Sequence, residues 1–129
     1  MKRSLIVVLA VSVLVACGGS GSKEKKADDK AESKTTDLSQ NPDYQNGLSL
    51  VAKSNCLTCH NVDQVVTGPP YREIANKYGD MPDTIIAHLA KKIISGGNGV
   101  WGQIFMTPHP DVSQADAEAM VKYILLLKK

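Results

Sequence analysis

Aromatic residues are scarce in this sequence of 129 residues, which has one Phe, one Trp and four Tyr. No stretch of useful length alternates apolar and polar residues, so half-buried β-strands are not expected. Apolar residues recur instead at helical spacing in the C-terminal two thirds of the chain. The pattern therefore predicts one small all-α domain. With so few aromatic side chains, a domain of fewer than about 100 residues has a thin core of its own.

The sequence also lacks an apolar run long enough to cross a membrane. Its longest run, residues 5–15, is shorter than the roughly 20 residues that a transmembrane helix needs. Lys2 and Arg3 precede this run, as in the export signals of bacteria. We therefore predict that residues 1–16 are a signal peptide. An uncleaved membrane anchor is the alternative.

The segment Leu14-Val15-Ala16-Cys17 resembles the lipobox of bacterial lipoproteins. The resemblance implies cleavage before Cys17, followed by acylation of its thiol and amine. Several acyl chains hold a protein firmly to a bilayer, because moving each CH₂ into water costs about 0.8 kcal/mol. Cys17 is thus the predicted lipidation site, and the mature chain is expected to be anchored to a bacterial membrane. An ordinary signal peptide that happens to end near a cysteine is the alternative.

Excess charge of one sign is absent from the mature chain. The whole sequence has 15 Lys and Arg against 13 Asp and Glu. Removal of Lys2 and Arg3 with the acid-free signal leaves 13 residues of each sign. No basic patch of the kind that binds phosphates is visible, so nucleic acid is not an expected partner.

Residues 17–40 form the next segment, in which lysines and acidic residues follow one another with almost no apolar residue before Leu38. Such a composition cannot bury enough surface to offset the entropy of ordering. We predict a disordered, charged tether, with a helix over residues 23–34 as the alternative. Residues 41–129 remain as the folded domain.

Four helices are predicted in this domain. The last carries Met120, Val121 and Ile124 on one stripe, which is expected to face the core. The first is expected to pack against the last near Tyr123, with Gly47 at the contact. The predicted helices run from Pro42 to about Ser54, from Tyr71 to Tyr78, from the N-cap Asp83 to Gly96, and from the N-cap Ser113, with Asp116 in the capping-box position, to about Leu127.

Cys56-Leu57-Thr58-Cys59-His60 is the C-x-x-C-H signature of covalent haem attachment. In one helical turn Cys56 and Cys59 point the same way, toward two vinyl groups on one edge of a porphyrin, and His60 can reach the iron from that side. A zinc site would need further ligands, and no cysteine follows position 59. A thioredoxin-like redox pair would need a βαβ context. With Cys17 assigned to lipid, no cysteine is left for a disulfide. A bound haem c would also supply the apolar body that the thin core lacks.

At this point the chain resembles the class I mono-haem cytochromes c, in particular the small bacterial electron carriers. The resemblance runs from about Pro42 to the C-terminus. It implies the class I cytochrome c fold, with about four helices wrapped around one covalently bound haem. The residues that carry it are Cys56–His60, Gly68-Pro69-Pro70-Tyr71, Gly99-Val100-Trp101-Gly102 ahead of Met106, and the closing amphipathic helix.

The resemblance also implies roles for residues around the haem. The carbonyl of Pro69 would accept a hydrogen bond from the His60 imidazole, which orients the ring and tunes the iron. Trp101 and Lys92 match positions that pair with a buried haem propionate, which reduces the cost of burying its charge. A turn at Pro69, a core tryptophan and a solvated lysine are the simpler alternatives.

Met106 is the expected second axial ligand of the iron, because it lies in the irregular segment before the last helix, where the family places its distal methionine. Met120 is assigned to the core and Met81 lies closer to the C-x-x-C-H motif. A bis-histidine haem through His109 is an alternative, whereas His88 has the polar neighbours of a surface histidine.

A His/Met pair leaves no open coordination position, and the methionine raises the reduction potential relative to a second histidine. This arrangement favours transfer of single electrons over catalysis. We therefore expect a carrier, not an enzyme, that shuttles electrons between a donor and a terminal acceptor of a respiratory chain. Its haem domain is expected in the periplasm or at the cell surface, as a monomer or as a subunit of a respiratory complex. A haem enzyme or gas sensor, in which a small ligand displaces Met106, is the alternative.

Overall fold

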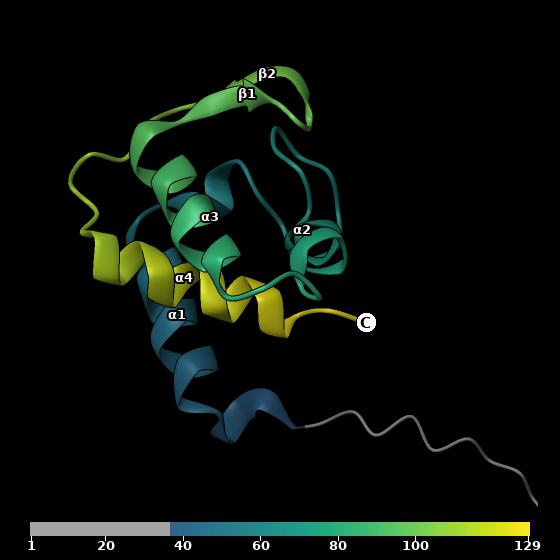
Figure 1. Cartoon of the computed structure of the whole chain (residues 1–129), viewed down its shortest axis with the longest axis vertical. Coiled ribbons are helices and arrows are strands. Elements are labelled where there is room, and N and C mark those ends of the chain that lie inside the picture. The colour runs from purple at the N-terminus through teal and green to yellow at the C-terminus, as the bar shows by residue number, and fades with distance from the viewer. Residues whose placement is uncertain (1–36) are drawn as a thin grey trace, which may run out of the picture. The chain divides into compact units, whose positions relative to one another are not determined.

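The structure is a computed structural model that describes residues 37–129 (Figure 1). The predicted signal peptide, Cys17 and nearly all of the predicted tether lie outside the described residues. Among the helices of residues 37–129, none is both long and apolar enough to cross a membrane. The elements are η1 (Leu38–Gln40), α1 (Pro42–Lys53), η2 (Cys56–Thr58), α2 (Tyr71–Tyr78), α3 (Thr84–Ser95), β1 (Gly97–Gly99), β2 (Gly102–Met106) and α4 (Gln114–Leu126).

Local capping explains where α1 and α4 begin. The Asn41 side chain accepts a hydrogen bond of 3.1 Å from the Tyr44 amide, and proline occupies the first position of α1. The Ser113 hydroxyl accepts from the Asp116 amide at 3.1 Å and donates to the Asp116 carboxylate at 2.8 Å. The predicted bounds of both helices are confirmed to within a residue or two.

Asp83 stands at the predicted N-cap position of α3, but its side chain makes no capping hydrogen bond. Its backbone has helical dihedral angles, φ −56° and ψ −19°. An N-cap residue needs an extended backbone to turn its side chain back toward the first amides of the helix.

The last helix, α4, lies at the centre of the domain, where it contacts α1, α2 and α3 (Figure 1). Its predicted apolar stripe is confirmed, because Met120, Val121 and Ile124 are all buried. The predicted crossing of α1 and α4 is also confirmed. A Cβ atom added to Gly47 would lie 2.3 Å from the Cβ of Tyr123, so only glycine permits the observed approach of the two helices.

A two-stranded antiparallel sheet follows α3 and was not expected from the sequence. Strands β1 and β2 pair Gly97 with Met106 and Gly99 with Gly102. The three glycines have φ of 134°, 113° and 101°, values that other residues rarely adopt. The hairpin thus depends on the backbone conformation of its glycines and not on alternating side chains. For this reason the apolar pattern of the sequence did not predict it. The domain is otherwise helical, as the predicted class I cytochrome c fold requires.

Candidate haem site

The two cysteines of the motif lie on and just after the turn η2. The amides of Cys59 and His60 both donate to the Cys56 carbonyl, at 3.2 and 3.0 Å. Asn55 enters the turn with a φ of 56°, in the left-handed region that asparagine tolerates better than most residues. Both thiols are free; that of Cys56 is half-buried and that of Cys59 is exposed. The predicted helical turn is therefore a single 3₁₀ turn.

His60 is held in one tautomer. Its Nδ1 lies 2.8 Å from the carbonyl oxygen of Pro69, which can only accept a hydrogen bond. Nδ1 therefore carries the proton, and Nε2 keeps its lone pair for a metal. This contact is the one that the resemblance implied for Pro69.

The chain after His60 lies close against the imidazole. A Cβ atom added to Gly68 would be 2.4 Å from Cε1 of His60 and 2.9 Å from each ring nitrogen. The Gly68 amide donates to the Cys59 carbonyl at 2.8 Å, and the Tyr71 amide donates to that of Asn61 at 2.9 Å. These bonds close the loop and bring the Pro69 carbonyl to the ring.

Tyr71 is a residue of the site that the sequence did not reveal. Its ring stacks on the imidazole of His60, with the two ring centroids 5.3 Å apart and the planes inclined by 15°. In the sequence Tyr71 stood out as the end of the Gly68–Tyr71 segment and as the first residue of a helix, but no role at the site was assigned to it. A stacking contact across ten residues and a loop has no local sequence signal.

Burial raises the pKa of the Cys56 thiol, although a hydrogen bond with Tyr71 opposes the shift. The thiol of Cys56 is therefore neutral near pH 7.

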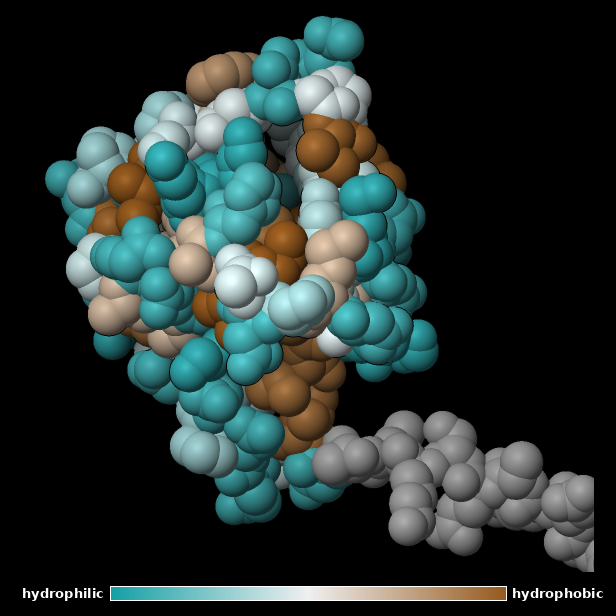
Figure 2. Space-filling model, viewed as in Figure 1, coloured by the Kyte–Doolittle hydropathy of each residue, from teal (hydrophilic) through white to brown (hydrophobic). Residues whose placement is uncertain are grey.

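Apolar side chains surround this region without being buried by protein. Val65 on the loop after η2 is 70 % exposed, and Ile104 on β2 is 63 % exposed. Leu57, Val66 and Val100 are exposed as well. In Figure 2 strongly hydrophobic residues likewise reach the surface of the domain in several places. A large, flat, apolar macrocycle would cover such side chains, so these residues fit a haem.

The methionines have distinct positions. Met120 is fully buried in the core, which confirms the prediction and removes it as a metal ligand. Met81 is 47 % exposed in the loop before α3. Met106 ends β2 and is half-buried. Of the two histidines weighed as alternatives, His88 is exposed on α3 and His109 is half-buried.

Trp101 and Lys92, the predicted propionate partners, have different neighbours. The Trp101 ring packs edge-to-face on that of Tyr78 in α2, with centroids 6.5 Å apart. The ammonium of Lys77 lies 5.8 Å from the centroid of the Trp101 ring. The ammonium of Lys92 lies against β1, 3.4 Å from the position that a Cβ on Gly97 would take. Lys77 is thus a further cation close to the predicted haem environment.

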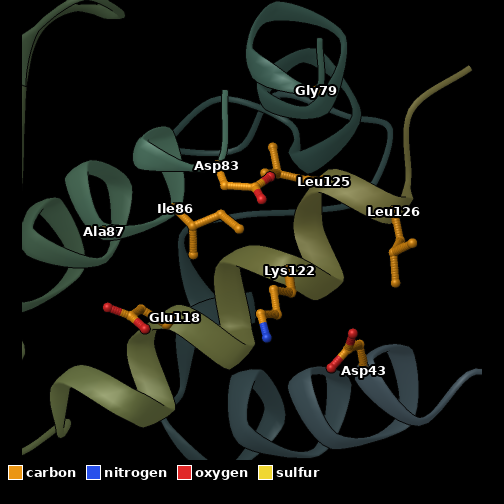
Figure 3. A pocket seen from close by; sticks show the side chains of 9 residues that line it. All are labelled: Asp43, Gly79, Asp83, Ile86, Ala87, Glu118, Lys122, Leu125 and Leu126. Atoms are coloured by element: carbon orange, nitrogen blue, oxygen red, sulfur yellow. The ribbon is translucent and has the colours of Figure 1, made fainter. Parts of the chain in front are cut away.

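A hollow of about 610 Å³ lies elsewhere, over α4 between α1 and α3 (Figure 3). None of the predicted haem-binding residues lines it. Its floor is apolar, and its rim carries three carboxylates and one ammonium. The lining residues are Asp43, Gly79, Asp83, Ile86, Ala87, Glu118, Lys122, Leu125 and Leu126.

Comparison with known proteins agrees with this geometry. The family model described as cytochrome c matches residues 44–128. Cytochrome c-552 of Nitrosomonas europaea is 48 % identical over 84 residues, which cover 65 % of this chain and 81 % of that protein. Cytochrome c-551 of Allochromatium vinosum is 42 % identical over 81 residues, covering 60 % and 82 % respectively. The crystal structure of the Nitrosomonas protein superposes with a TM-score of 0.59 over 63 % of this chain and 99 % of that one.

Proposed function

This chain belongs to the cytochrome c family, and from that premise we propose that it is a membrane-tethered carrier of single electrons. It carries one covalently bound haem c, for which the Cys56–His60 segment has the C-x-x-C-H attachment motif. The bound haem supplies an iron that alternates between the ferrous and ferric states.

In this proposal His60 and Met106 are the axial ligands, and Cys56 and Cys59 form the thioethers. The observation that carries it is the hydrogen bond from Nδ1 of His60 to the Pro69 carbonyl, because it leaves the lone pair of Nε2 available to a metal. Met106 would supply its thioether as the second ligand. With both ligands supplied by the chain, the haem would serve electron transfer and would be closed to small ligands.

The surroundings of the haem would be supplied by residues on the hairpin and on α3. Trp101 and Lys92 would offer an indole N–H and an ammonium to a haem propionate. The mixed charge of the mature chain, with 13 residues of each sign after removal of the signal, favours docking through apolar surface around the haem edge. The partners would be two redox proteins, an electron donor and a terminal acceptor of a respiratory chain. The protein would meet them either as a free carrier or as a subunit of a larger complex.

Export and lipidation complete the proposal. Covalent haem attachment takes place outside the cytoplasm, so the signal-like residues 1–16 and the haem motif support each other. Acylation of Cys17 would anchor the chain, and the residues between Cys17 and the turn η1 would let the domain move over the membrane surface to meet its partners.

Axial ligation is tested with Met106→Leu, with Met81→Leu as the matched control. We expect Met106→Leu to lose the near-infrared absorption band of ferric iron bound to sulfur and to bind carbon monoxide rapidly when reduced. Met81→Leu should retain the band and should not bind carbon monoxide rapidly. Rapid carbon monoxide binding by the unaltered protein would favour a haem enzyme or gas sensor instead.

The anchor is tested with Cys17→Ala in a host that matures both lipoproteins and cytochromes c. We expect the unaltered chain in the membrane fraction with the mass of the added lipid. The variant should lack that mass while its haem spectrum is unchanged. An unaltered chain recovered without lipid would contradict the tether.

A further inference from the structure

The imidazole of His60 has two constraints of different kinds. Its Nδ1 is fixed at one point, 2.8 Å from the Pro69 carbonyl oxygen. A single hydrogen bond leaves the ring free to tilt about that point. The stacked ring of Tyr71, inclined by only 15°, restricts this tilt because the two planes lie nearly parallel.

Tyr71 is itself firmly placed. It is 3 % exposed, so its ring has little room to move. Its other ring neighbour is Tyr123 of α4, packed edge-to-face at 6.3 Å with an interplanar angle of 84°. Aromatic pairs in such geometries attract each other beyond the effect of their burial, which favours one ring orientation.

Tyr123 is in turn held from the far side. Tyr44 of α1 packs edge-to-face on it at 5.1 Å, and the backbone of Gly47 lies against its Cβ. The rings of His60, Tyr71, Tyr123 and Tyr44 thus form a continuous aromatic column, which runs from the haem-attachment turn to the crossing of α1 and α4.

We propose that Tyr71 is a positioning residue for the axial histidine, and that the aromatic column transmits the α1–α4 packing to the plane of the His60 imidazole. The inference rests on the proposed role of His60 as an iron ligand. It goes beyond that role because it assigns the orientation of the ligand to side chains outside the haem-attachment motif.

The plane of an axial imidazole has its own signature. The ring π orbitals overlap with particular d orbitals of low-spin ferric iron, so a rotated or mobile ring changes the g values of the electron paramagnetic resonance (EPR) spectrum. It also changes the spread of the paramagnetically shifted haem-methyl signals in the proton NMR spectrum. Neither readout responds to a loss of global stability while the holoprotein stays folded.

The test compares Tyr71→Leu with Tyr71→Phe in the purified ferric holoprotein. Tyr71→Phe keeps the stacked ring, so its g values and haem-methyl pattern should match those of the unaltered protein. Tyr71→Leu keeps an apolar side chain but loses the stacking. We expect it to show shifted or heterogeneous g values, a changed haem-methyl pattern and a shifted reduction potential.

Val121→Ala is the control for stability. Val121 is 2 % exposed and belongs to a separate core cluster between α3 and α4 that contains none of the four rings, so its truncation weakens the core without removing a contact of the column. It should lower the denaturation midpoint and leave the g values unchanged.

A Tyr44→Leu variant examines the far end of the column and should move the g values in the same direction as Tyr71→Leu, by a smaller amount.

Unchanged g values and haem-methyl shifts in folded Tyr71→Leu would overturn the inference. If that variant fails to fold, nuclear Overhauser contacts between the Tyr71 and His60 rings in the unaltered holoprotein decide the question, and their absence would also overturn it. An unaltered protein without low-spin His/Met spectra would instead contradict the proposed function, so the two failures are distinguishable.

Discussion

At position 68, glycine lets the backbone lie against the ring of a histidine. The space that a side chain would need is already taken by the imidazole of His60, whose Cε1 would be 2.4 Å from an added Cβ. The same approach brings the next residue, Pro69, within hydrogen-bonding distance of Nδ1. The glycine and the proline thus have separate tasks, one steric and one polar.

We expect Gly68→Ala to displace the His60 ring. Forcing an extra methyl group into a filled space typically costs about 1–3 kcal/mol, so the free energy of unfolding should fall by an amount of that order. The displaced ring should also alter the ferric EPR spectrum. Denaturant titration and EPR spectroscopy of the holoprotein measure the two effects.

Thr67→Ala is a suitable control, because Thr67 is the exposed neighbour of Gly68 and the change removes atoms instead of adding them. Its stability and spectrum should stay near those of the unaltered protein. A Gly68→Ala protein with unchanged stability and spectrum would mean that the loop can move away from the ring at little cost.

Among the elements, the crossing of α1 and α4 organises the domain. An alanine in the middle of a helix is normally better than a glycine by about 1 kcal/mol. At Gly47 the crossing reverses this preference. An added Cβ would be 2.3 Å from the Cβ of Tyr123 and 2.5 Å from the carbonyl oxygen of Ala119, and that backbone oxygen cannot move aside alone.

We therefore expect Gly47→Ala to destabilise the protein in spite of the gain in helix propensity. The cost of overpacking, about 1–3 kcal/mol, should exceed the gain and lower the denaturation midpoint. Ser49→Ala, at an exposed position of the same helix, should leave the midpoint nearly unchanged or raise it slightly. A raised midpoint for Gly47→Ala would show that α1 and α4 can separate at little cost.

For the molecule as a whole, Arg72 of α2 connects the loop after η2 with the end of α4. Its guanidinium pairs with Asp63 on the loop after η2 and donates to the Leu127 carbonyl at the end of α4. The hydrogen bond from Arg72 lowers the pKa of Asp63 below its ordinary value. The ionised carboxylate is therefore more favourable in the folded than in the unfolded state.

The sign of the pH dependence follows from this shift. Because the pKa of Asp63 is lower in the folded than in the unfolded state, the ionised carboxylate stabilises the protein at any pH above the unfolded pKa of about 3.9. This contribution disappears as the pH falls through the pKa of the folded state. We expect Asp63→Asn to unfold more easily than the unaltered protein at pH 7. The difference should shrink as the pH falls below about 5, where Asp63 of the unfolded chain starts to be protonated while that of the folded protein is still ionised.

Denaturant titrations from pH 7 to pH 3 measure this difference, with Asp111→Asn as the control at an exposed aspartate. The control should show no comparable pH-dependent difference. A constant difference between Asp63→Asn and the unaltered protein over the whole range would mean that the carboxylate acts through its shape and not through its charge.

Much of the candidate site could be predicted from short segments of sequence. The C-x-x-C-H motif, the helix bounds and the Ser113 cap depend on residues within one or two turns of each other, so their spacing alone carries the information. The buried stripe of α4 could be predicted for the same reason, because helical periodicity places Met120 and Ile124 on one face.

Tertiary structure alone decided the rest. The stacking of Tyr71 on His60, the packing of Trp101 on Tyr78 and the link from Arg72 to Leu127 join residues that are brought together only when the loops close. The hairpin at Gly97 depends on backbone dihedral angles that leave no apolar pattern. Local sequence supplies the attachment motif, whereas tertiary packing places the ring of Tyr71 against the imidazole of His60.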